Sequence, residues 1–191
     1  MKQFELNKSF NKRLFIVDNF YNDPNTVRDI ALSMEFVEDL RYYKGLRSTK
    51  PYRSQEIKSF FETIIGEPIN NWENHGFNGC FQITTSEDPQ VYHCDMQKWA
   101  AMVYLTPNAP YDSGTRLHIH KETGLFNGTQ PEIGNAFAGG FYDSTKFDTL
   151  AMAGNVFNRL VIMDAQNIHS AGTYFGNSRE TGRLVQLFFF D

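Results

Sequence analysis

Cysteine is scarce in this 191-residue chain, which contains only Cys80 and Cys94. Two cysteines do not make the disulfide framework of a small secreted domain, so a reducing, cytoplasmic compartment is the expected one. Long apolar runs are missing as well, since no stretch approaches the ~20 residues that cross a bilayer. The chain begins Met-Lys-Gln-Phe-Glu-Leu-Asn-Lys, which lacks the apolar segment of a secretory signal. We therefore expect a cytoplasmic protein with no membrane span.

An excess of positive charge is also missing. Lys and Arg number 18 against 22 Asp and Glu, which makes the net charge -4. This balance argues against a protein that holds nucleic acid through a basic surface. Charged residues make up 21% of the chain and aromatic residues 15%, a composition of folded rather than disordered chains. The length suits one domain, and neither a repeat nor a Gly/Ser/Pro-rich linker divides it.

Helical periodicity is confined to the first third of the sequence. After a short strand candidate at 15–17, Asp23 and Pro24 form a helix start, with Asp as the N-cap and Pro in the first turn. The apolar stripe of this helix is Val27, Ile30, Ala31 and Met34. A second helix is predicted over about 54–65, with Gly66 at its C-terminal end.

From Gly79 onward, short strand-like segments alternate with turn residues. The strand candidates are 80–85, 91–95, 100–106, 115–121, 157–163 and 183–190. Residues 123–156 read as a long irregular stretch, of the length that often forms a lid or substrate loop. We predict a single domain over 1–191, with a helical layer over about 1–78 and a β-sandwich or barrel over about 79–191.

The most informative motif is the tripeptide His93-Cys94-Asp95. On a strand, side chains alternate, so His93 and Asp95 would point to the same face. His169 follows an apolar strand and is the best candidate for a third ligand. Two histidines and one carboxylate form the ligand set of non-haem Fe(II) oxygenases, which leaves positions for a chelating co-substrate and O2. The alternative is that His-x-Asp arises by chance and that His169 is structural.

Arg183 begins the last strand and shares a face with Val185, Leu187 and Phe189. A guanidinium on an apolar face is costly unless an anion pairs with it. A small dicarboxylate co-substrate would supply that anion through two parallel hydrogen bonds. The alternative is a salt bridge to a protein carboxylate at the sheet edge.

The order of these motifs resembles the Fe(II)/2-oxoglutarate-dependent dioxygenases, and most closely their prolyl-4-hydroxylase-like branch. That family shows His-x-Asp, a strand ending in Tyr-Leu-Asn, a Gly/Thr turn, an apolar strand, a distal His, and Arg or Lys at the start of the final strand. In this chain the corresponding segments are His93-Cys94-Asp95, 102–106, Gly114-Thr115, 158–163, His169 and Gly182-Arg183. The resemblance covers about residues 79–191, and the opening at 17–24 is common in the same branch. It implies a double-stranded β-helix, a jelly-roll barrel related to cupins.

The resemblance also implies a hydroxylase that uses Fe(II), 2-oxoglutarate and O2 on a C–H bond of a substrate. His93, Asp95 and His169 would bind the metal, and Arg183 would hold the distal carboxylate of 2-oxoglutarate. Tyr104 falls where some members place a hydroxyl on that carboxylate, although a core aromatic residue explains it equally well. Arg179 is a competing anchor, and Arg183 is preferred because it begins the strand directly.

The substrate side is less defined in the sequence. Tyr43 and Arg47 lie in a loop that can reach over the barrel mouth, and Trp99 follows the His-x-Asp segment. Surface packing is the alternative for all three. The family suggests a peptidyl residue such as proline, with a small molecule as the other option.

A second histidine pair complicates the metal assignment. His118 and His120, with Glu122, are similar to the metal motif of cupins, but the spacing from Gly114 is too short and Glu122 follows too soon. These histidines would instead line the substrate opening or lie on a solvated strand face. A cupin-type metalloenzyme and a non-catalytic β-barrel binding module are therefore the two alternative functions.

Overall fold

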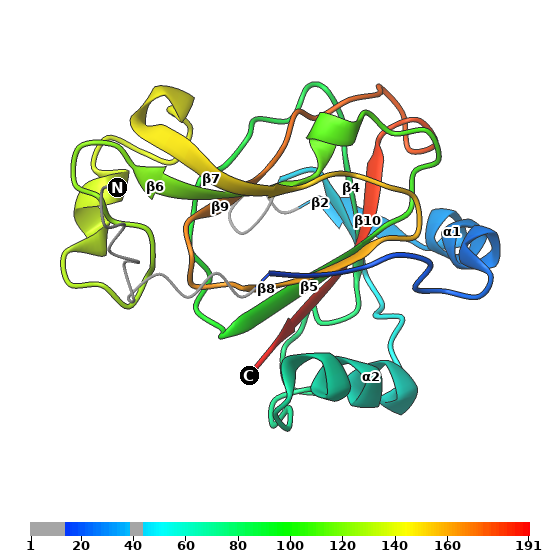
Figure 1. Ribbon diagram of the computed structural model, residues 1–191. Helices are drawn as coiled ribbons and strands as arrows, with labels where there is room; N and C mark the ends of the chain where they lie inside the picture. The colour runs from blue at the N-terminus through cyan, green and yellow to red at the C-terminus, as the bar shows by residue number, and fades with distance from the viewer. Residues whose placement is uncertain (1–13, 39–43) are drawn as a thin grey trace, which may run out of the picture.

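The computed structural model describes residues 14–38 and 44–191 and contains two antiparallel sheets that face each other. Figure 1 shows the smaller sheet on one side of the larger one and α2 on the other side. The larger sheet has the strand order β1 (Leu14–Val17), β8 (Leu160–Asp164), β5 (Trp99–Tyr104), β10 (Arg183–Phe190), β4 (Phe81–Thr84), β3 (Leu46–Ser48) and β2 (Phe36–Glu38). The smaller sheet has the order β7 (Phe147–Ala153), β6 (Thr115–His120) and β9 (His169–Ala171). Three short 3-10 turns lie at Tyr111–Ser113, Ile133–Phe137 and Ser144–Lys146.

Both predicted helices form, and local capping sets their ends. Helix α1 (Pro24–Ser33) begins after Asp23, whose Oδ1 accepts a hydrogen bond of 3.1 Å from the Thr26 amide. Helix α2 (Gln55–Ile65) begins after Ser54, whose Oγ accepts the Ile57 amide at 3.3 Å. It ends at Gly66, where φ is +74°, a conformation that glycine adopts without a Cβ clash.

Alternation along the central strands separates two cores. On β5, the residues Ala100, Met102 and Tyr104 point between the sheets and pack with Leu117 and Ala153 of the smaller sheet. The intervening residues Trp99, Ala101 and Val103 point outward and pack under the helices, with Ala31 of α1 and Phe61 of α2. The inner core forms the barrel, and the outer core attaches the helical layer to it. This arrangement is the predicted double-stranded β-helix.

The prediction of a strand over 91–95 is wrong. Within that stretch only His93 forms a bridge, to His169, and the flanking residues belong to no strand. The segment is extended but makes isolated contacts, because its neighbours in space are the turn before β9 and the chain near Phe141.

The expectation of an irregular stretch over 123–156 is also wrong at its end, where β7 lies. Strand β7 pairs with β6, and the register shifts between Leu117 and His118, so that Leu150 is an extra residue. This bulge interrupts the alternation of apolar residues that a sequence pattern depends on. Strands β2, β3 and β9 have three residues each, too few for periodicity to reveal. Strands β1, β2 and β3 belong to the larger sheet, so the region predicted as a helical layer contributes strands to the barrel as well as helices.

Neither of the helices in the described ranges could cross a membrane, since α1 has 10 residues and α2 has 11.

Candidate metal centre and co-substrate pocket

Three potential metal ligands converge at one end of the barrel. One ligand atom from each of His93, Asp95 and His169 lies within 4.8 Å of the others. The two carboxylate oxygens of Asp95 are each 3.5 Å from one imidazole nitrogen, Oδ1 from His93 Nε2 and Oδ2 from His169 Nε2. Among residues 14–38 and 44–191, this is the one group of three or more such side chains close enough to share an ion.

Main-chain pairing brings these residues together. The amides of His93 and His169 exchange hydrogen bonds with each other's carbonyls, at 3.1 and 2.8 Å. The Asp95 amide donates to the Ala165 carbonyl at 2.9 Å, which continues the pairing along the chain. His169 also opens β9 and pairs with Leu117 of β6. The predicted same-face placement of His93 and Asp95 thus arises from an extended segment rather than from a regular strand.

Each histidine is oriented through its Nδ1 atom. Nδ1 of His169 lies 2.8 Å from the Asn167 carbonyl oxygen, and Nδ1 of His93 lies 3.3 Å from the Val91 carbonyl oxygen. A carbonyl oxygen only accepts, so in the neutral rings the proton is on Nδ1. Both Nε2 lone pairs then face Asp95, which is how metal-ligating histidines are commonly held.

The electrostatics of His169 also suit a metal ligand. Burial, followed by the nearby His93, lowers the pKa of His169 to about 4, although Asp95 acts in the opposite direction. The ring is therefore neutral at pH 7, as a ligand must be. Two neutral imidazoles and a carboxylate fit a divalent first-row metal ion, and they fit Fe(II) in the oxygenase ligand set.

Arg183 begins β10 on the same face as Val185, between the two sheets, and is only 4% exposed. Its Nε donates to the Ser113 carbonyl at 2.8 Å, and its guanidinium carbon is 5.4 Å from the Tyr104 ring centroid. Within the part of the chain that the structure describes, no Asp or Glu forms an ion pair with Arg183. The alternative of a salt bridge at the sheet edge thus has no partner there, and a buried cation with no protein anion fits a bound carboxylate.

Two further residues near Arg183 were not identified from the sequence. The ring centroid of Tyr174 is 6.0 Å from the Arg183 guanidinium carbon, and burial raises the pKa of its hydroxyl, so it remains a donor. Thr84 lies directly opposite Arg183 in the β4–β10 register, and its buried Oγ1 has no hydrogen-bond partner among residues 14–38 and 44–191. An orphaned hydroxyl beside a guanidinium is the surface that a carboxylate would complete. Neither residue has a local sequence signal, because each depends on the pairing of distant strands.

Tyr104 is fully buried on the inner face of β5, and its hydroxyl donates to Thr115 Oγ1 at 2.8 Å. Burial raises its pKa, while Arg183 partly offsets this effect. Its ring packs in the inner core and lies beside Arg183. The position of Tyr104 is therefore compatible with both interpretations, a core aromatic residue and a residue near the co-substrate carboxylate.

The competing anchor, Arg179, is held elsewhere. Its Nη2 donates to the Met34 carbonyl at 2.9 Å, and its guanidinium carbon lies 4.6 Å from the Phe36 ring centroid. These contacts place Arg179 against the connection between α1 and β2.

The proposed role of Trp99 at the substrate opening is not supported by its position. Trp99 is 1% exposed on the outer face of β5, and its Nε1 donates to Glu67 Oε1 at 2.8 Å. The side chain points toward the helical layer because alternation places Ala100, not Trp99, between the sheets. Tyr43 lies outside the described residues.

Arg47 lies on β3 and is buried rather than extended into solvent over the barrel mouth. Its guanidinium carbon is 4.8 Å from the Phe77 ring centroid and 5.8 Å from that of Phe189. Since Arg47 is opposite Gln82, and Gln82 is opposite Val185, its side chain shares the inner face of the sheet.

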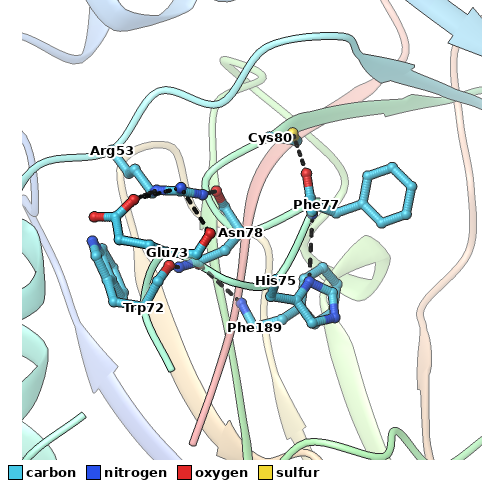
Figure 2. A network of polar contacts seen from close by, with 9 residues as sticks. Arg53, Trp72, Glu73, His75, Phe77, Asn78, Cys80 and Phe189 are labelled. Atoms are coloured by element: carbon cyan, nitrogen blue, oxygen red, sulfur yellow. Dashed lines mark hydrogen bonds and ion pairs between the residues drawn. The ribbon is translucent and has the colours of Figure 1, made fainter. Parts of the chain in front are cut away.

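A polar network supports the chain beside Arg47 (Figure 2). Asn78 Nδ2 donates to the Trp72 carbonyl at 2.6 Å, and Asn78 Oδ1 accepts the Phe189 amide at 3.1 Å. Arg53 adds a hydrogen bond to the Asn78 carbonyl and an ion pair with Glu73, each at 2.6 Å. These contacts tie segment 72–78 to the end of β10.

The same segment brings His75 close to the candidate metal centre. The His75 ring centroid lies 5.0 Å from that of Phe189, and its Nε2 is 3.1 Å from the side-chain amide of Gln97, two residues after Asp95.

The second histidine pair is buried, so the reading of a solvated strand face is wrong. His118 Nε2 lies 2.8 Å from Ser170 Oγ, and His120 Nδ1 lies 2.8 Å from Thr123 Oγ1. Burial, followed by His169, lowers the pKa of His118 to about 4. In the described parts of the chain, neither histidine joins Glu122 in a metal-capable group. The cupin ligand set therefore does not assemble.

Comparison with known proteins supports the fold. No family model and no curated protein matches the sequence. Among solved structures, a prolyl hydroxylase from Trichoplax adhaerens, in complex with a hypoxia inducible factor peptide fragment, matches with a TM-score of 0.50 and 13% identity over 93% of this chain and 83% of that chain. A Pseudomonas putida prolyl-4-hydroxylase matches with a TM-score of 0.47 and 12% identity over 94% and 92% of the two chains. The Fe(II)/α-ketoglutarate-dependent dioxygenase TqaL matches with a TM-score of 0.47 and 11% identity over 92% and 81%. The chain therefore has the double-stranded β-helix fold of the Trichoplax prolyl hydroxylase.

Proposed function

We propose that this protein is an Fe(II)- and 2-oxoglutarate-dependent dioxygenase that hydroxylates a C–H bond. The observation that carries the proposal is the combination of two features inside one barrel. One is the His93–Asp95–His169 cluster, in which both Nε2 atoms face the carboxylate. The other is Arg183, which is buried between the sheets and has no ion pair with a carboxylate among the described residues.

Each residue would have a defined task. His93, Asp95 and His169 would hold the metal, while the two Nδ1–H groups donate to the carbonyl oxygens of Val91 and Asn167. When bound, Fe(II) supplies the redox chemistry by which O2, 2-oxoglutarate and a substrate C–H bond become succinate, CO2 and a C–OH group.

The pocket residues would orient the co-substrate. Arg183 would take its distal carboxylate through two parallel hydrogen bonds. The candidate hydroxyl donors beside it are Thr84, which lies opposite Arg183 on β4, and Tyr174, whose ring centroid is 6.0 Å from the guanidinium carbon. Tyr104 would contribute its ring, because its hydroxyl donates to Thr115 Oγ1. Apolar side chains of the inner core, including Met102 and Val185, would exclude water from the space between anchor and metal.

For the substrate we propose a peptidyl residue, because the Trichoplax prolyl hydroxylase of the same fold was solved with a peptide. Arg47 on the inner face of β3 and His75 beside Gln97 are the candidate contacts. A small molecule is the alternative that a substrate screen separates.

The test is an anaerobic titration of the purified protein with Fe(II) and then 2-oxoglutarate, followed by visible absorbance. A charge-transfer band that requires both components, together with succinate formation when O2 is admitted, is the expected result. Stoichiometric iron binding without the band would limit the protein to a metal site. Folded protein that binds neither component would be a non-catalytic binding module.

A further inference from the structure

We propose that residues 126–130, here called the 126–130 turn, position the metal ligands through hydrogen bonds that reach His169 by way of Asn167. This inference rests on the proposed metal centre. The turn lies outside the cluster and contributes no ligand, yet it touches both chain segments that do.

The 126–130 turn pairs with the segment just before His169. The Phe126 carbonyl accepts the Ile168 amide at 2.6 Å, and the Gly128 amide donates to the Gln166 carbonyl, also at 2.6 Å. Between these two bonds, Asn127 forms a bridge with Asn167. Asn127 Nδ2 also donates to Asn167 Oδ1 at 3.0 Å. Main chain and side chain of Asn167 are therefore held from the same side.

Asn167 is in turn the residue that orients His169. Its carbonyl oxygen, 2.8 Å from His169 Nδ1, keeps the proton on that nitrogen and leaves Nε2 toward Asp95. Asn167 is 1% exposed, so water cannot replace its contacts readily. Rotation of the Asn167 peptide would release the imidazole from its metal-facing orientation.

The turn is itself rigidly built. Asn127 Oδ1 accepts two hydrogen bonds from Thr129, from the amide at 2.9 Å and from Oγ1 at 2.7 Å. These bonds direct the NH2 group of Asn127 toward Asn167. Gln130 Oε1 accepts the amides of Phe126 and Asn127, at 2.7 and 2.9 Å, which closes the turn.

The opposite side of the turn contacts the other ligand segment. A Cβ placed on Gly128 would lie 3.4 Å from Cys94 Cβ, and Cys94 stands between His93 and Asp95. One turn thus contacts the chain next to all three candidate ligands. It holds them in place before any metal binds, so its loss should lower metal affinity more than it lowers fold stability.

The test compares Asn127→Ala with the matched control Asn135→Ala. Asn135 belongs to the same excursion of the chain between β6 and β7 and is exposed, and its side chain donates from Nδ2 to Glu132 Oε2 at 3.4 Å. Each protein is titrated with Co(II) under anaerobic conditions, and the visible d–d absorption reports both affinity and coordination geometry. Thermal unfolding of the metal-free proteins is measured alongside.

We expect Asn127→Ala to bind Co(II) about 10- to 100-fold more weakly than the unaltered protein, with an altered absorption band. Asn135→Ala should match the unaltered protein. Thr129→Val removes only the exposed hydroxyl that orients Asn127 and should weaken binding by about two- to tenfold. It decides the question if Asn127→Ala does not fold.

Affinity within twofold and an unchanged band for a folded Asn127→Ala protein would overturn the positioning role. So would unchanged binding by Thr129→Val if Asn127→Ala is unfolded. If the unaltered protein binds no Co(II), the proposed metal centre fails and the positioning role fails with it. The two failures are therefore distinguishable by which protein shows them.

Discussion

The candidate metal centre and the residues around Arg183 belong to the same barrel but are held in different ways. His93 and Asp95 come from an extended segment that meets His169 of β9 through a single bridge, and the His93 side chain is 39% exposed. Arg183, Tyr104 and Thr84 stand on central strands of the larger sheet and are almost fully buried. A site at the edge of the regular structure is open to a metal and a substrate, but needs local contacts to stay organised. A site on central strands needs no such support, and a substitution there changes the stability of the whole fold because the interior is closely packed.

The largest effect is expected at the candidate metal centre, from His169→Ala. Loss of one of three ligands should lower metal affinity by at least about 100-fold and abolish 2-oxoglutarate turnover. The measurement is Fe(II) stoichiometry under anaerobic conditions with succinate formation. His118→Ala is the control, because His118 is buried next to Ser170 but belongs to no metal-capable group of the described residues. Full iron binding by His169→Ala would show that the triad is wrongly assigned.

At the buried Arg183, the substitution Arg183→Met should weaken 2-oxoglutarate binding by roughly 30-fold to several thousand-fold, the equivalent of about 2–5 kcal/mol. Iron binding should change little. Arg183→Lys keeps the charge and should retain part of the affinity. The comparison variant is Arg179→Met, whose guanidinium is held by Met34 and Phe36. If co-substrate affinity falls in that variant and not in Arg183→Met, the anchor has been placed on the wrong arginine.

Two buried histidines, one in the candidate metal centre and one next to it, should make the stability of the protein depend on pH. The pKa values of His118 and His169 are both lowered to about 4, mainly by burial. An unfolded chain protonates its histidines near pH 6.5, while the folded chain resists until about pH 4, so the free energy of unfolding should decrease as the pH falls through that window. Urea denaturation of the metal-free protein at several pH values measures this, and the expected loss is on the order of a few kcal/mol. His118→Gln should flatten the profile in part. Equal stability at pH 7 and pH 4.5 would contradict the burial of neutral histidines.

The smallest effect is expected from Thr84→Val. Its Oγ1 has no hydrogen-bond partner among the residues that the structure describes, so removing it should leave the thermal stability unchanged or slightly higher. If the hydroxyl meets the co-substrate carboxylate beside Arg183, 2-oxoglutarate affinity should fall by about two- to tenfold. Calorimetric titration and a thermal melt of the same sample separate the two effects. Unchanged 2-oxoglutarate affinity would show that Thr84 does not contact the co-substrate.

Much of the framework was predictable because its signals are local. The cap at Asp23, the end at Gly66 and the whole of β10 over Arg183–Phe190 match the sequence-based expectations. Ligand candidates at His93, Asp95 and His169 could be named because His-x-Asp requires only an extended chain, whether or not it is a regular strand. Tyr174 could not be named, because its proximity to Arg183 depends on how the chain after β9 passes the inner face.

The sequence by itself determined the helix ends, the candidate metal ligands and the order in which they occur, since these depend on near neighbours in the chain. Only the tertiary structure decided that Trp99 points to the helices, that His118 lies buried near His169, and that Asn127 reaches Asn167 across 40 positions. The physical reason is that a side chain's face and partners are set by strand register and by the bulge in β7, and both arise from pairing between distant segments.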